Sequence, residues 1–164
     1  MSGRDTNERT RSALDGLHQG VPSLQLEFSA VAEELGRVRE ALRSWLAQTG
    51  IEQRFAYDLL LAVNEACSNS IEHGHGGDGG PITLRAGVDT VIRVVVSDTG
   101  HWLDRPPDRT TDRGRGLAMM RALVPDTRVT SDESGTTVEF VAPRGAATVP
   151  RDTDQEGFDR AGLR

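Results

Sequence analysis

The sequence predicts an α/β fold of two layers, in which helices cover one face of a mixed, mostly antiparallel β-sheet. Three observations predict it: a short segment of alternating apolar and polar residues, two amphipathic helical segments after it, and four further β-rich segments. With 164 residues, of which 36% are hydrophobic, the chain can build one core but not two ordinary domains. We expect one domain at residues 21–144, between a disordered polar tail at 1–20 and a flexible polar tail at 145–164.

The first two elements follow from periodicity. Apolar and polar residues alternate over Leu24–Ser29, which is the period of a half-buried strand. From Val31 to Leu46, apolar residues recur at steps of three and four, which is typical of an amphipathic helix. Ser29 is the expected N-cap of this helix, and Gly50 is its expected stop.

A second helix is predicted from Gln53 to His73, because its apolar residues share one face and Gly74 follows. Away from that face, Glu65, Asn69 and Glu72 fall within about 60° of arc. Such residues are either solvated surface groups or ligand-binding groups. Small residues flank them and leave room for a ligand.

The rest of the domain is predicted to be mainly β-structure. Ile82–Val88 and Thr90–Ser97 are rich in β-branched residues and are so closely joined that they predict an antiparallel hairpin, which ends at Asp98. The remaining predicted elements are an exposed loop at His101–Arg113, a short helix at Gly116–Leu123, and two strands at Thr127–Ser131 and Thr136–Val141.

Three loops in this part carry residues suited to binding. Asp98-Thr99-Gly100 places a carboxylate and a glycine just beyond an apolar strand, although this tripeptide is also a common turn. Gly114 and Gly116 lie at the start of a helix whose first N–H groups could meet a phosphate, or they form a helix entry without a ligand. Gly135-Thr136 lies at a hairpin turn. Each loop by itself leaves both interpretations open.

Charge and composition exclude several function classes. The net charge of -6 argues against binding to nucleic acid, and no apolar run reaches the length that crosses a membrane. The lone Cys67 is expected to face the core, and the absence of cysteine pairs and of a secretory signal predicts a cytoplasmic protein. His73, His75 and His101 lack partners at a metal-binding spacing, so no zinc site is predicted.

Taken together, the motifs resemble in order and spacing the four boxes of the ATPase superfamily that includes gyrase, Hsp90 and histidine kinases. The motifs are Glu65-Ala66-x-x-Asn69, Asp98-x-Gly100, Gly114-x-Gly116-Leu117 and Gly135-Thr136. The resemblance covers Leu24 to Pro143 and implies a histidine kinase-like ATPase fold. Chain length, the VNEACSNSIEHG helix and the short lid before GRGLAMM look most similar to the anti-sigma regulatory serine/threonine kinases of bacteria.

The resemblance also implies roles for single residues. Glu65 would be the general base, Asn69 would bind nucleotide and coordinate magnesium through its amide oxygen, and Asp98 would accept a hydrogen bond from the adenine amino group. The other implied nucleotide contacts are His73, Gly100, Gly114, Arg115, Gly116, Leu117 and Thr136. A solvated lid side chain stays the alternative for Arg115. Trp102 stands where the family often has a second glycine of its first glycine loop.

The implied function is regulation of transcription by a magnesium- and ATP-dependent protein serine kinase. In this family the kinase sequesters a sigma factor and phosphorylates a small antagonist protein, and a homodimer is implied as well. One alternative is a regulatory module that grips a partner, with or without ATP, and has no kinase activity. Another is a separate ATP-hydrolysing or histidine-phosphorylating unit.

Overall fold

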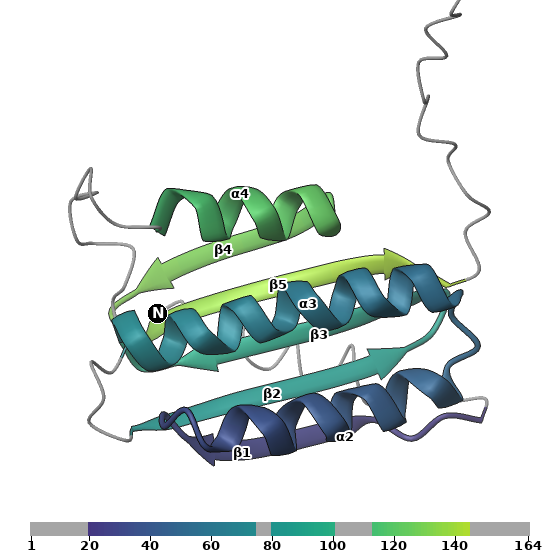
Figure 1. Cartoon of the computed structure of the whole chain (residues 1–164), viewed down its shortest axis with the longest axis horizontal. Helices are drawn as coiled ribbons and strands as arrows, with labels where there is room; N and C mark the ends of the chain where they lie inside the picture. Colours follow the sequence, from purple (N-terminus) through teal and green to yellow (C-terminus); the bar gives the residue numbers. More distant parts are fainter. Residues whose placement is uncertain (1–19, 75–79, 101–112, 145–164) are drawn as a thin grey trace, which may run out of the picture.

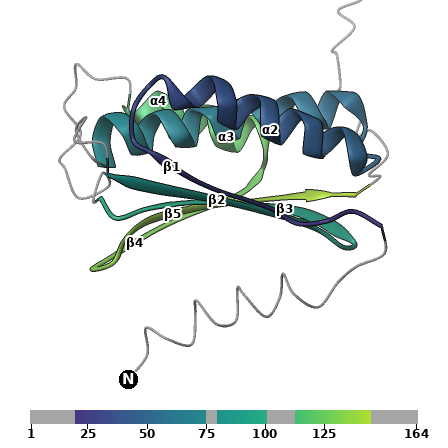
Figure 2. The same cartoon turned by 90° about the horizontal axis from the view of Figure 1, so that it is seen from below.

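The computed structural model describes residues 20–74, 80–100 and 113–144. In these residues the chain forms two layers, an antiparallel sheet and a layer of helices over one of its faces (Figures 1 and 2). This arrangement confirms the predicted fold class. The predicted tails, except Gly20, and residues 101–112 of the predicted loop lie outside the described residues. In the part of the chain that is described, no helix has both the length and the apolar character needed to cross a membrane.

The described strands form one sheet in the order β1-β2-β3-β5-β4. Their bounds are β1 Leu24–Ser29, β2 Pro81–Val88, β3 Val91–Asp98, β4 Asp126–Asp132 and β5 Gly135–Pro143. The predicted hairpin is confirmed as β2 and β3, and every described pairing is antiparallel. One row of apolar side chains crosses all these strands on the face that the helices cover, as the two-residue period requires: Leu26, Leu84, Val96, Val138 and Val129.

Helix α2 (Glu34–Gln48) begins later than the sequence predicts. The expected cap, Ser29, is still in β1, where it pairs with Pro81, so it cannot also cap the helix. The residue at the N-cap position is Glu33, and its side chain makes no capping hydrogen bond. On the inner side of the helix, the Trp45 indole donates a hydrogen bond of 2.7 Å to the Pro22 carbonyl and so ties α2 to the start of β1.

Helix α3 (Gln53–Asn69) begins where predicted but ends before His73. A π-helix at Ser70–Gly74, referred to below as the π-turn, follows it directly. A wider turn of this kind is common at functional sites. Helix α4 (Arg113–Leu123) begins earlier than predicted. Packing of α4 against α3 outweighs the low helix propensity of the glycines in its first turn.

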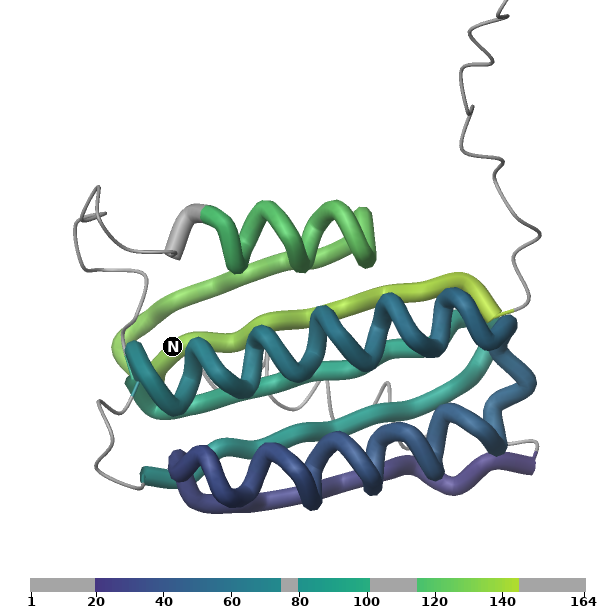
Figure 3. The backbone as a smooth tube through the Cα atoms, in the orientation of Figure 1, coloured from purple at the N-terminus to yellow at the C-terminus, as the bar shows by residue number. Residues whose placement is uncertain are grey.

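The helices lie side by side over the sheet, with α3 between α2 and α4 (Figure 3). In the same view, the C-terminal end of α3, the end of β3 and the starts of α4 and β5 lie at the same end of the molecule (Figures 1 and 3). The sheet brings Asp98 and Thr136 opposite each other at this end. The residues of the four sequence motifs therefore share one edge of the domain.

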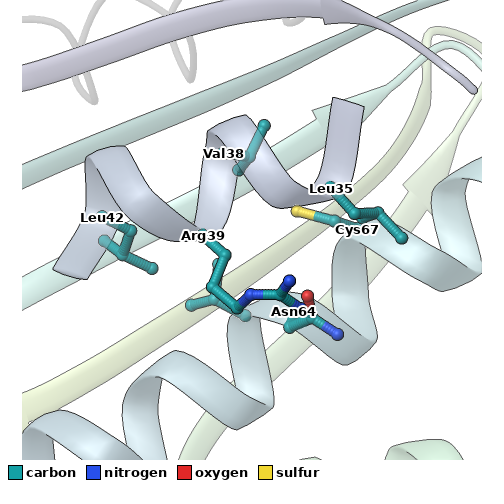
Figure 4. A pocket seen from close by; sticks show the side chains of 7 residues that line it. Leu35, Val38, Arg39, Leu42, Asn64 and Cys67 are labelled. Carbon is teal, nitrogen blue, oxygen red and sulfur yellow. The ribbon is translucent and has the colours of Figure 1, made fainter. Parts of the chain in front are cut away.

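A small cavity lies elsewhere, between α2 and α3 (Figure 4). The side chains of Arg39 and Asn64 extend toward one another there, and Cys67 also lines it. The cavity has a volume of about 10 Å³ for water, which is room for about one water molecule. This cavity is therefore too small to hold a nucleotide.

Cys67 is expected to react with alkylating agents only when the chain unfolds. The residue is buried in the core, as predicted, and burial raises the pKa of its thiol from 9.0 to about 12. Because only the thiolate reacts, we expect iodoacetamide at pH 8 to modify the native chain about 10³-fold more slowly than the urea-unfolded chain. Mass spectrometry over time measures both rates, and equal rates would contradict the burial of Cys67.

Candidate active site

Asp98 ends β3 and is the centre of the first half of the site. It points to the helix-covered face of the sheet, where only 6% of the residue is exposed. Its Oδ1 atom accepts a hydrogen bond of 2.7 Å from the backbone N–H of Gly100. This contact is an Asx-turn, which holds a carboxylate against the backbone that follows it. The strand end thus places a nearly buried acceptor in a defined orientation.

Thr136 anchors the same loop from the neighbouring strand. Its hydroxyl donates a hydrogen bond of 2.9 Å to the Gly100 carbonyl, and only 1% of the residue is exposed. Gly100 is therefore held on both sides, because Asp98 accepts from its N–H and Thr136 donates to its carbonyl. Thr136 and Asp98 are also direct partners across β3 and β5.

Close backbone contacts explain two glycines of this half. Gly135 has a φ of +133°, and a Cβ atom there would lie 1.9 Å from the Asp98 carbonyl oxygen. A Cβ atom on Gly100 would lie 1.9 Å from the carbonyl oxygen of Gly74, at the end of the π-turn. Real Cβ atoms do not approach backbone oxygens so closely, so larger residues would force these segments apart.

Glu65 and Asn69 form the second half, one turn apart on α3. The first turns of α4 pack directly on them: a Cβ atom on Gly116 would lie 2.5 Å from Glu65 Oε1 and 3.4 Å from Asn69 Nδ2. Asn69 is 7% exposed and Glu65 is half-buried. The sequence left open that this face of the helix is fully solvated. The burial of Asn69 excludes that alternative for this residue. Gly116 leaves the space that the two polar side chains occupy.

The structure places the other predicted contact residues at different depths. His73 is half-buried in the π-turn, with Nε2 3.8 Å from Glu72 Oε2. Leu117 packs against the hydrophobic core, whereas Arg115 is exposed on the first turn of α4. Gly114 lies in the same helical turn. Glu72, which shares the polar face in the sequence, is exposed and lies outside the two halves described above.

A magnesium ion would find oxygen ligands here rather than a preformed cage. No group of three or more His, Cys, Asp or Glu side chains able to hold a metal occurs in residues 20–74, 80–100 and 113–144. Magnesium prefers oxygen ligands, keeps several waters and is often bound through one or two protein oxygens together with phosphates. The nearly buried amide of Asn69 beside the start of α4 fits that mode. Trp102, His75 and His101 lie outside the described residues.

The four sequence motifs contain the residues of both halves of this candidate site but not Gly74. In the sequence, Gly74 is predicted only to end the second helix. In the structure this residue contacts Gly100 and the Asp98 carboxyl group, so it joins α3 to the loop that follows β3. No periodicity could have found this contact, because the two segments meet only when α3 lies across the sheet.

Comparison with known proteins gives matches over nearly the whole described region. The model of the histidine kinase-like ATPase domain family matches residues 28–142. Serine-protein kinase RsbW of Bacillus subtilis strain 168 is 28% identical in an alignment of 152 residues that covers 83% of this chain and 94% of that protein. Serine-protein kinase RsbW of Bacillus velezensis is 30% identical in an alignment of 155 residues that covers 85% of this chain and 96% of that protein.

A solved structure is similar as well. It contains the RsbU and RsbW domains of Rv1364c from Mycobacterium tuberculosis, with a TM-score of 0.62 and 30% sequence identity. The match covers 75% of this chain and 32% of that chain, so this chain corresponds to about a third of the larger protein. Both halves of the site, from Glu65 to Thr136, lie inside the region matched by the family model.

Proposed function

Because the chain belongs to the family of histidine kinase-like ATPase domains and has serine-protein kinase RsbW among its relatives, we propose that it is a magnesium-dependent protein serine kinase and anti-sigma factor. The match to this family's model confirms the family that the four motifs resemble. In the proposed function, the kinase transfers the γ-phosphate of ATP to a serine of a small antagonist protein and sequesters a sigma factor. One observation carries the proposal: the oriented carboxylate of Asp98 lies at the same edge of the domain as the carboxylate of Glu65 and the amide of Asn69.

Asp98 suits the recognition of adenine. A carboxylate accepts hydrogen bonds only, and the exocyclic amino group of adenine is a donor. Its orientation is set before any ligand arrives, because Oδ1 is held by the Gly100 N–H. Thr136 fixes the carbonyl of the same glycine, so the loop beside the base keeps its shape. Preorganisation of this kind lowers the entropy that binding has to offset.

Asn69 and the start of α4 suit the phosphates. The first N–H groups of a helix and its dipole favour an anion, and α4 begins beside the polar face of α3. Asn69 would hold magnesium through its amide oxygen. Mg²⁺, when bound, would neutralise negative charge on the phosphates. Arg115 is exposed in the first turn of α4 and can approach a phosphate from solvent.

Glu65 is the proposed general base. Its carboxylate lies one turn before Asn69 and against Gly116, so it faces the same space as the proposed phosphate site. There it would accept the proton of the attacking serine hydroxyl as the oxygen bonds to phosphorus. Phosphoryl transfer depends mainly on positioning and on neutralising charge, so one oriented base, one metal ligand and a helix start are a sufficient set.

Titration calorimetry with ATP, with and without Mg²⁺, tests the nucleotide site. We expect binding that depends on magnesium. Asp98→Asn should weaken it about 10- to 100-fold, the cost of one hydrogen bond to a charged group. Asn69→Ala should remove most of the magnesium dependence. Asp89→Asn is a matched control, because Asp89 makes a similar turn at the other end of β3, with Oδ1 2.6 Å from the Val91 nitrogen.

Two results would count against the proposal. Failure of the wild-type chain to bind millimolar ATP would leave a partner-binding module that needs no nucleotide as the better account. Equal weakening by Asp98→Asn and by the control Asp89→Asn would show that binding occurs away from Asp98.

A further inference from the structure

Gly74 lies against the whole carboxyl group of Asp98. A Cβ atom on Gly74 would lie 2.9 Å from Asp98 Oδ1, 3.0 Å from Cγ and 3.2 Å from Oδ2. Real Cβ atoms essentially never approach another atom to less than 3.0 Å, and the two longer distances are also tighter than most real contacts, so a side chain here would displace the carboxyl group. None of the roles proposed above explains why the chain has a glycine at the end of the π-turn.

The Asp98 carboxyl group has little room to retreat from such a side chain. Asp98 is nearly buried, and its strand lies between β2 and β5. Its own carbonyl oxygen is closely approached by the backbone of Gly135. Rotation about the side-chain bonds is therefore the movement left to it. That rotation would break the 2.7 Å hydrogen bond from Gly100 that sets the present orientation.

The π-turn itself is held against the same loop. The backbone of Gly74 touches that of Gly100. A Cβ atom on Gly100 would lie 1.9 Å from the carbonyl oxygen of Gly74 and 2.3 Å from the carbonyl carbon of Gly74. One oxygen of the Asp98 carboxyl group thus accepts a hydrogen bond from the N–H of Gly100, and the Cα of Gly74, which carries no side chain, packs against the carboxyl group. Its orientation depends on both glycines.

We propose that Gly74 determines the base specificity of the site by positioning the Asp98 carboxylate. This inference rests on the proposed function, because it assumes that Asp98 meets the base of the nucleotide. In the observed orientation the carboxylate would accept from the amino group of adenine. Guanine has a carbonyl oxygen at that place, and two acceptors repel each other.

A rotated carboxylate would lose this selectivity. Guanine carries an N–H and an amino group next to its carbonyl, and both can donate to a carboxylate that has turned toward them. A side chain at residue 74 is expected to cause that turn. The site would then bind ATP less tightly and distinguish ATP from GTP less well. Gly74 is a positioning residue in this scheme, since it acts only through Asp98.

Calorimetric titration with ATP and with GTP, both with Mg²⁺, measures the ratio of the two dissociation constants. We expect the wild-type chain to prefer ATP, and Gly74→Ala to weaken ATP binding at least tenfold and to bring the ratio within about threefold of one. Gly36→Ala is the control, because Gly36 is exposed on α2 and a Cβ atom there meets nothing within 4 Å. It should change neither affinity.

The double variant Gly74→Ala with Asp98→Asn separates positioning from general damage. If Gly74 acts through Asp98, adding Gly74→Ala to Asp98→Asn does not change the ratio of the dissociation constants for ATP and GTP. An alanine that lowers both affinities by the same factor, and leaves the ratio as in the wild-type chain, would overturn the inference. So would a wild-type chain without preference for ATP.

A third variant covers the case in which Gly74→Ala does not fold. Asp98→Glu keeps the charge but shifts the carboxylate by one methylene, so it should also bring the ATP to GTP ratio close to one. A ratio like that of the wild-type chain would overturn the inference. A wild-type chain that binds neither nucleotide overturns the proposed function as well, whereas binding with an unchanged ratio in these variants overturns only the role of Gly74.

Discussion

Glu65→Gln is expected to lower the rate of phosphoryl transfer by about 10²- to 10⁴-fold, the usual contribution of a general base. The amide keeps the size of the carboxylate, so the packing of Glu65 against Gly116 should be preserved. It cannot take up the proton of the attacking serine. The measurement is the acid-stable ³²P label that passes from [γ-³²P]ATP to the antagonist protein, together with the affinity for ATP, which should change little.

The matched control for this variant is Glu72→Gln. Glu72 is on the same polar face in the sequence, but its side chain is 66% exposed and lies on the π-turn. We expect no change in transfer from this control. Transfer by Glu65→Gln at the wild-type rate would contradict the proposed base and favour a module that signals by binding alone. Acid-labile label would instead indicate phosphohistidine.

Phe140→Ala is expected to lower the free energy of unfolding by about 3–5 kcal/mol, the usual cost of removing a buried phenylalanine. Phe140 is fully buried on β5, an interior strand that also carries Thr136 of the site. Since small domains are stable by only about 5–15 kcal/mol, this loss is a large fraction of the total stability. Urea unfolding followed by circular dichroism measures the loss.

The control for the core is Tyr57→Ala on α3. Tyr57 is 61% exposed, so we expect a change within about 0.5 kcal/mol. If Phe140→Ala cost no more than this control, the core on the helix-covered face of the sheet would not be the one described. The comparison uses two aromatic residues of the same domain, which differ mainly in burial.

Local patterns predicted most of the fold. The alternation over β1, the tight β2–β3 hairpin and the start of α3 are all where the sequence places them, because strand and helix periods are properties of neighbouring residues. The ends of the helices were less well predicted. Ser29 has the chemistry of a cap but is engaged in the sheet, and the glycines at the start of α4 lie inside a helix that packing against α3 supports.

The sequence alone determined the family, the two-layer fold and the residues of the four motifs, because residue type, order and spacing along the chain were enough to predict them. Only the tertiary structure decided which of these residues meet. Gly116 lies against Glu65 and Asn69, and Gly100 lies against Gly74, because α3 crosses the sheet between its neighbouring helices. Contacts between segments so far apart in the chain depend on how the layers pack, which no local period encodes.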